Sequence, residues 1–138
     1  MSTLRPPAVA FAVVVLTCLL GAATSAHHSR AGYDTAKERL TTHNGVVAEV
    51  IWRNPHVYLI WGNKDDKGTL VNWTGEFSSP ATMMSEGLSR DTFKAGDPLM
   101  VTFMPARAGT PQGLVIKVAR PDGKVVIDLS QRRGLLDQ

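Results

Sequence analysis

The chain has 138 residues, of which 43% are hydrophobic and 20% charged, so it has room for one ordinary globular domain and not for a multidomain enzyme. Its 12 Gly and 8 Pro are too few for a low-complexity chain, and no collagen or heptad period is visible. The formal net charge is +3 and the basic residues are scattered, so the chain lacks the electrostatic footprint of a nucleic-acid-binding protein.

The N-terminus has the pattern of a secretory signal peptide. Arg5 precedes an apolar run from Ala8 to Ala22, and small residues suited to signal peptidase follow. The run has about 15 residues, short of the roughly 20 that a membrane-spanning helix needs, so we expect no membrane anchor. These features predict a periplasmic or secreted bacterial protein.

Two cleavage points fit the small residues before the mature chain. Thr24 and Ala26 favour cleavage after Ala26, which makes 1–26 the signal peptide, and cleavage after Ser25 is the alternative. Either cut removes Cys18, the single cysteine, so the mature domain has no disulfide and no thiolate chemistry.

The mature chain begins with a polar segment and continues into a long strand. Residues 27–39 show no sustained period, which predicts an extended N-terminal arm with Tyr33 as its anchor. The first strand follows from Leu40, and Gly45 inside it suggests a bulge. Asn54-Pro55 ends it. The residues expected on one face of this strand are Val46, Ala48, Val50 and Trp52.

The remaining elements predict further strands and one short helix. Residues 57–61 and 69–77 form a hairpin around a polar turn, and strands are expected at 99–104, 114–118 and 125–129. Ser79-Pro80 starts a helix that Gly87 closes, and Ala81, Met84 and Leu88 fall at helical spacing.

Three strands, a short helix and two or three more strands is the order of an OB-type barrel. We therefore predict an all-β fold with one short helix, a small OB-like Greek-key barrel of five to six strands over residues 40–129. Residues 130–138 form a flexible tail.

The mature N-terminus predicts a copper site. If His27 becomes the first residue, its free amine and its ring Nδ1 can chelate one ion, and amine and imidazole ligands favour Cu(II). A third nitrogen would come from His56, at the corner formed by residues 52–56, with His43 as second choice. His28 is a further candidate ligand. Cleavage after Ser25 would make it the third residue of the mature chain, where its ring can bind the ion together with the terminal amine and the intervening backbone nitrogens.

Each metal candidate has a structural alternative, because a polar residue after a signal peptide is common and a His at a turn often only forms hydrogen bonds. Trp52, Asn54 and Trp73 are candidate contacts for an organic ligand, although packing explains the tryptophans as well. Met83, Met84 and Met104 are thioether candidates, with Met84 expected in the core and Met83 ambiguous. The acids Glu49, Glu76 and Asp97 fit solvated strand faces or turns.

No nucleophile elbow, H-E-x-x-H motif, phosphate loop or dinucleotide fingerprint is present. The sequence therefore favours a non-catalytic periplasmic module that binds a protein or small ligand. A copper-binding protein is the alternative, and a small copper-dependent oxidoreductase ranks third.

At these residues the chain resembles an uncharacterised family of short exported bacterial proteins. The resemblance rests on His27-His28-Ser29 and on Trp-x-Asn-Pro-His at 52–56, and it continues through most of the mature domain. It implies a small exported β-domain of unassigned function. Further matching segments are Tyr33-Asp34, Val71 to Trp73, Ser79-Pro80, Gly87, Lys94 to Asp97 and Pro105 to Arg107; Arg30, Met83 and Met84 depart from the pattern.

Overall fold

The structure, a computed structural model, describes residues 28–132. The chain divides into two units between Ala31 and Gly32. In the first unit, the described residues form one helical turn, α2 (His28–Ala31). The other helices and strands belong to the second unit.

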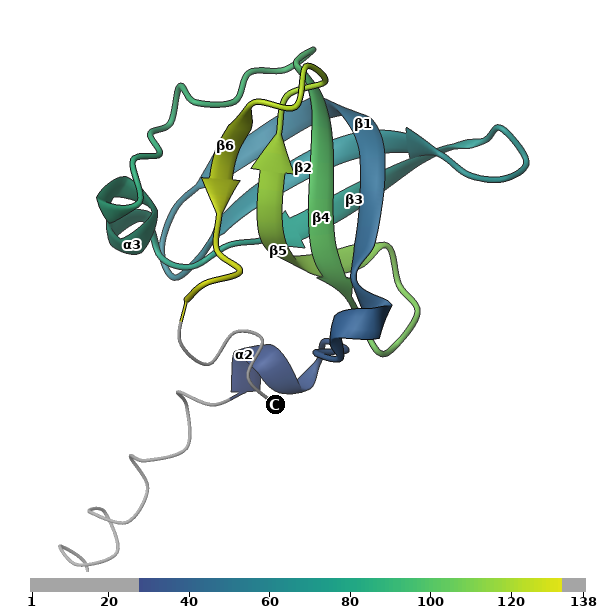
Figure 1. Cartoon of the computed structure of the whole chain (residues 1–138), viewed down its shortest axis with the longest axis horizontal. Coiled ribbons are helices and arrows are strands. Elements are labelled where there is room, and N and C mark those ends of the chain that lie inside the picture. The colour runs from purple at the N-terminus through teal and green to yellow at the C-terminus, as the bar shows by residue number, and fades with distance from the viewer. Residues whose placement is uncertain (1–27, 133–138) are drawn as a thin grey trace, which may run out of the picture. The chain divides into compact units, whose positions relative to one another are not determined.

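Five strands of the second unit close into a barrel (Figure 1). Neighbouring strands are antiparallel except for β3 and β5, which close the barrel through a parallel pairing of 74–76 with 112–114. A sixth strand extends the sheet beside β5. The strands are β1 (Thr41–Trp52), β2 (Val57–Lys64), β3 (Leu70–Glu76), β4 (Pro98–Pro105), β5 (Gln112–Ala119) and β6 (Val125–Asp128).

The strands follow the order β1-β2-β3-β5-β4 around the barrel, with a helix between β3 and β4 in the chain. This is the arrangement of a small OB-like barrel, which removes exposed strand edges by closure. The predicted fold class is therefore confirmed.

The β2–β3 hairpin forms as its residue pattern predicts. Val57, Leu59 and Trp61 alternate with partly exposed neighbours and are at most 1% exposed. In the turn, the Asp65 carboxylate accepts hydrogen bonds from the backbone N–H groups of Lys67 and Thr69. The hairpin extends beyond the barrel at this turn (Figure 1).

The centre of β1 differs from the prediction. Its register against β2 shifts between Val47 and Glu49, which accommodates Ala48 as an extra residue. Val47 is 2% exposed before the shift, whereas Trp52 packs against the core after it. The prediction that Val46, Ala48, Val50 and Trp52 lie on one face is wrong, because the bulge inverts the alternation: Val46 is 48% exposed, whereas Val50 and Trp52 pack against the core.

Gly45 is needed for a close approach, and the predicted bulge lies three residues further on. A Cβ atom at Gly45 would lie 2.5 Å from Cδ1 of Trp61 and 2.7 Å from the carbonyl oxygen of Gly62. At Gly75 a Cβ would lie 2.5 Å from Val115 and 2.8 Å from Trp61. The two glycines therefore make room for the Trp61 indole inside the barrel.

The helix α3 (Pro80–Ser85) begins where the sequence predicts. The Ser79 hydroxyl accepts a hydrogen bond from the N–H of Thr82 at 3.3 Å, and Gly87 ends the helix with a φ of +86°. The expectation that Met84 enters the core is wrong: Met83 is fully buried and Met84 is 57% exposed. The helical spacing of Met84 and Leu88 is the reason for expecting Met84 in the core. Because Gly87 turns the chain before Leu88, Leu88 lies outside the helix and that spacing does not apply.

The predicted extended arm is corrected as well. Besides α2, it contains a 3-10 turn, η1 (Lys37–Arg39), in which the N–H of Leu40 donates to the carbonyl of Lys37. The Arg39 guanidinium lies 3.1 Å from the Asp34 carboxylate, which holds this turn at the start of β1. Among the described residues, no helix is both long and apolar enough to cross a membrane.

Candidate functional site

The corner between β1 and β2 positions His56. Trp52 ends β1, the Asn54–Pro55 peptide bond is cis, and His56 directly precedes β2. The backbone beyond His56 is fixed to the end of β3, because Val57 donates to the carbonyl of Ser78 at 3.0 Å and its own carbonyl accepts from Phe77 at 2.8 Å. A ring at this corner therefore projects from rigid backbone.

The His56 imidazole is held through one nitrogen. Its Nδ1 lies 3.0 Å from the carbonyl oxygen of Phe77 and 3.2 Å from Oε1 of Glu76. Both oxygens are acceptors, so Nδ1 carries the proton and donates it, which leaves the lone pair of the neutral ring on Nε2. The side chain is 29% exposed, and the hydrogen bonds described for it use Nδ1.

Glu76 links His56 to the N-terminal arm. Its Oε2 accepts a hydrogen bond of 2.8 Å from the hydroxyl of Tyr33, while its Oε1 faces His56. The Glu76 side chain is 14% exposed. Burial, followed by the hydrogen bond to Glu76, raises the pKa of Tyr33 well above its usual value, so the hydroxyl stays a donor. We call Tyr33, His56 and Glu76 the His56 cluster.

A second tyrosine lies beside this cluster. Tyr58 is paired with Glu76 across the β2–β3 hairpin, and its ring centroid is 6.4 Å from that of His56. Burial and the charge of Glu76 raise the pKa of Tyr58, while the charge of Arg53 lowers it. The outer face at this corner therefore carries two hydroxyls, one imidazole and one carboxylate, with a guanidinium nearby.

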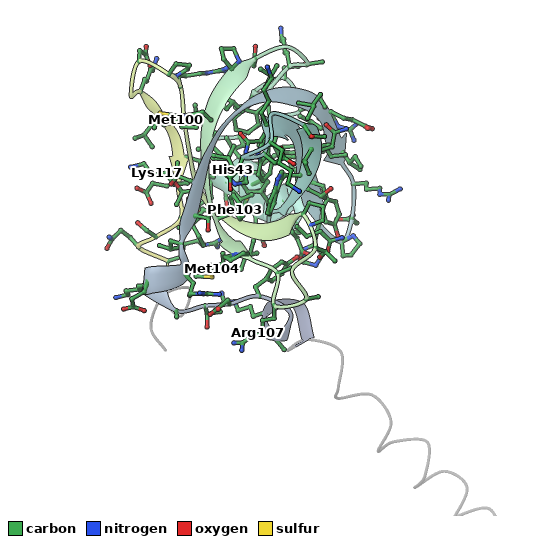
Figure 2. The ribbon with its side chains drawn as sticks, turned by 90° about the vertical axis from the view of Figure 1, so that its right-hand side faces the viewer. His43, Met100, Phe103, Met104, Arg107 and Lys117 are labelled. Atoms are coloured by element: carbon green, nitrogen blue, oxygen red, sulfur yellow. The ribbon has the colours of Figure 1, made fainter. Side chains whose placement is uncertain are left out.

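The second-choice histidine lies among aromatic rings. His43 on β1 is 4.6 Å from Trp73 and 4.8 Å from Phe103 between ring centroids, in edge-to-face geometry, and 6.2 Å from Trp61. Figure 2 shows the side chains of His43 and Phe103 together within the barrel. We call these four residues the aromatic cluster. Burial lowers the pKa of His43, and its Nδ1 is buried without a hydrogen-bond partner among residues 28–132.

The three residues expected to contact an organic ligand lie in two places. Trp52 and Asn54 belong to the corner beside His56, and Asn54 is exposed. Trp73 belongs to the aromatic cluster and packs against the core, as does Trp52. The structure therefore does not gather the three side chains around one point.

Parts of the predicted metal site lie outside the described residues. These are His27 and the cleavage site at Ala26; His28 lies in α2. Among residues 28–132, no group of three or more His, Cys, Asp or Glu side chains could hold a metal ion. The described contacts of His56 engage Nδ1 and leave the lone pair of Nε2 to a ligand.

The sequence-based interpretation of Glu76 as an acid on a solvated strand face is wrong, because its side chain is 14% exposed and contacts Tyr33 and His56. The hairpin pairing contained a usable signal. Once Asp65 to Thr69 is taken as the turn, Tyr58 falls opposite Glu76 and next to the corner of His56. The approach of Tyr33 had no such signal, because it is separated from Glu76 by 43 residues.

Comparison with known proteins places the chain in a family. The model of a family of unknown function, DUF6152, matches residues 14–117. The chain belongs to this family. No curated protein and no solved structure matches it. In this DUF6152 protein, two segments that carried the resemblance meet at one carboxylate: Tyr33 of the arm and His56 of the corner both contact Glu76.

Proposed function

We propose that this DUF6152 protein is an exported, non-catalytic binding module and that its ligand is a Cu(II) ion bound through Nε2 of His56. One observation carries the proposal: Nδ1 of His56 is engaged by the carbonyl of Phe77 and the carboxylate of Glu76. Metal-binding histidines almost always donate their second ring N–H to a carboxylate or a backbone carbonyl, which fixes the tautomer and orients the ring.

The chemistry of the available donors favours copper. The mature domain contains no cysteine, and imidazole suits copper, zinc and nickel, with Cu(II) bound most tightly among the divalent ions. The other nitrogen ligands are expected from His27 and His28. This part of the proposal rests on the sequence alone.

The test is a Cu(II) titration of the full exported protein, followed by calorimetry with a competing chelator and by electron paramagnetic resonance. We expect tight binding near neutral pH and weak binding below about pH 5, because protons compete with the metal for ligand nitrogens. Mass spectrometry of the same sample identifies the first residue of the mature chain.

His56→Ala is the decisive variant, with His43→Phe as its matched control. We expect His56→Ala to lose at least tenfold in Cu(II) affinity and one nitrogen coupling in the resonance spectrum. His43→Phe should keep both, because His43 lies among rings with its Nδ1 buried. Equal Cu(II) binding by His56→Ala and the wild type would overturn the proposal.

The N-terminal ligands are tested separately. Placing one residue before His27, or replacing His27 by Ala, should remove most of the affinity if the free amine and the His27 ring chelate the ion. Unchanged binding would rule out the N-terminal chelate. His28→Ala asks whether the second histidine contributes.

A further inference from the structure

We propose that Tyr33 is a positioning residue for the His56 site: its hydroxyl fixes the carboxylate of Glu76, which in turn fixes the imidazole of His56. The inference rests on the proposed function, because it concerns the atom that would bind Cu(II). It adds a residue of the N-terminal arm, distant in sequence from the corner, that controls how the histidine presents its lone pair.

The first step is the division of one carboxylate between two donors. Oε2 of Glu76 receives the Tyr33 hydroxyl at 2.8 Å, and Oε1 lies 3.2 Å from Nδ1 of His56. A carboxylate held at both oxygens cannot turn about its terminal bond without losing one partner. At 14% exposure, Glu76 also has little water available to replace a lost donor.

The second step is the permanence of the tyrosine donor. Burial and the hydrogen bond to Glu76 both favour the neutral phenol over the phenolate. Tyr33 therefore keeps its O–H over the pH range in which copper binding would be measured. Its contribution does not depend on the protonation of another group on the arm.

The third step is the anchoring of Tyr33 itself. Its backbone forms an isolated antiparallel bridge with Ala106, just beyond β4. Arg107 donates twice to this segment, from its N–H to the carbonyl of Gly32 at 2.9 Å and from Nε to the carbonyl of Tyr33 at 2.8 Å. Asp34 donates to the carbonyl of Pro105 at 2.9 Å. Figure 2 marks Arg107 beyond Met104 at this end of the barrel.

These contacts form a continuous path from the β4–β5 connection through Tyr33 and Glu76 to His56. The path predicts that a variant which loosens residues 32–34 from the β4–β5 connection also changes the tautomer of His56. If the hydroxyl is lost, Glu76 is free to turn, and the Nδ1–H tautomer loses part of its stabilisation. Nε2 would then carry the proton in a larger fraction of the molecules, and in those molecules it has no lone pair for Cu(II).

The experiment compares Tyr33→Phe with Tyr58→Phe in the full exported protein. Tyr58 is the matched control, because it lies opposite Glu76 and near His56, yet none of the hydrogen bonds within residues 28–132 joins its hydroxyl to Glu76. Two readouts are needed: the His56 tautomer from ¹⁵N–¹H correlation spectra without metal, and the Cu(II) affinity. Urea unfolding checks that both variants are folded.

We expect Tyr33→Phe to lower the fraction of the Nδ1–H tautomer and to weaken Cu(II) binding about threefold to tenfold. This loss lies below the roughly 10- to 100-fold expected for Glu76→Gln, which removes the group that contacts the ligand histidine directly. Tyr58→Phe should change neither readout. Arg107→Ala should move both in the same direction as Tyr33→Phe, because it loosens the backbone that carries the hydroxyl.

The two readouts separate failure of this inference from failure of the proposed function. An unchanged tautomer in folded Tyr33→Phe overturns the positioning role, whatever copper does. A shifted tautomer in a protein that binds no Cu(II) supports the positioning role and overturns the copper proposal. A shift of equal size in Tyr58→Phe also overturns the inference, because it would show a general effect of removing a hydroxyl near Glu76.

Discussion

The barrel unit holds two histidines in opposite surroundings. The Nδ1 of His56 is bonded to a carbonyl and lies close to a carboxylate, whereas His43 lies among three aromatic rings and its Nδ1 has no hydrogen-bond partner within residues 28–132. Both side chains are partly exposed. The difference shows that two histidines of similar exposure can be held in quite different ways, one by polar partners and one by aromatic rings.

The partner of the N–H group makes the distinction. A ring with one nitrogen satisfied presents the other in a fixed direction, so it is prepared for a ligand. His43 is held by aromatic contacts, and burial lowers its pKa, which favours the neutral form of the ring. Substitutions in the His56 cluster should therefore change Cu(II) binding, and substitutions in the aromatic cluster should change the free energy of unfolding.

The largest expected effect is on the aromatic cluster. Phe103 is fully buried, so Phe103→Ala should lower the free energy of unfolding by about 3–5 kcal/mol, measured by urea denaturation. Tyr58→Ala, on the partly exposed outer face, is the comparison variant and should cost less. Equal losses would contradict the division between a stabilising interior and a binding surface.

The next effect comes from the space around Trp61. Gly45→Ala should lower the free energy of unfolding by about 1–3 kcal/mol, because the new methyl group meets both the indole and the carbonyl of Gly62. Gly62→Ala is the control: its methyl would meet Leu70 at 3.0 Å, and Leu70 is 65% exposed and able to move. A larger loss in Gly62→Ala would contradict the role assigned to Gly45.

A smaller effect is expected from His56→Ala. The variant loses the hydrogen bond to Phe77, with a net cost of about 0.5–1.5 kcal/mol, and water can reach the freed groups because the side chain is partly exposed. Urea denaturation without metal measures this value. A cost as large as that of Phe103→Ala would show that His56 is chiefly a structural residue.

The smallest effect is the pH dependence that His43 contributes. Its folded pKa is below the ordinary value of 6.5, so the unfolded chain takes up this proton at a higher pH than the folded protein. The contribution to stability is complete above pH 6.5 and falls as the pH drops from there towards the folded pKa. Unfolding between pH 7.5 and 5 should show a shallower slope in His43→Phe, and an identical slope would contradict this.

Local patterns in the sequence predicted most of the fold. Alternation identified the buried face of β2, and Ser79 with Gly87 marked the ends of α3 correctly. The errors arose where a single residue interrupted the alternation of a strand or the spacing of a helix. Ala48 in the bulge inverted the face of β1, and the turn at Gly87 exchanged Met83 for Met84 in the core.

The candidate site was predicted only in part. His56 stood out because Asn54-Pro55 places it at a corner, which is local information. Its connection to Tyr33 and Glu76 depends on the β2–β3 register and on the bridge between Tyr33 and Ala106. Such long-range pairings leave no periodic trace in a single sequence.

The join between β3 and β5 consists of three residue pairs, and Glu76 opposite Leu114 is the last of them. The carboxylate that contacts His56 therefore belongs to the shortest strand pairing around the barrel. Separating β3 from β5 would leave the carboxylate beside the imidazole, because Tyr58 opposite Glu76 and the hydrogen bonds of Val57 belong to the β2–β3 hairpin. The local hairpin therefore sets the histidine, and closure of the barrel adds Leu114 beside the strand residue that carries the carboxylate.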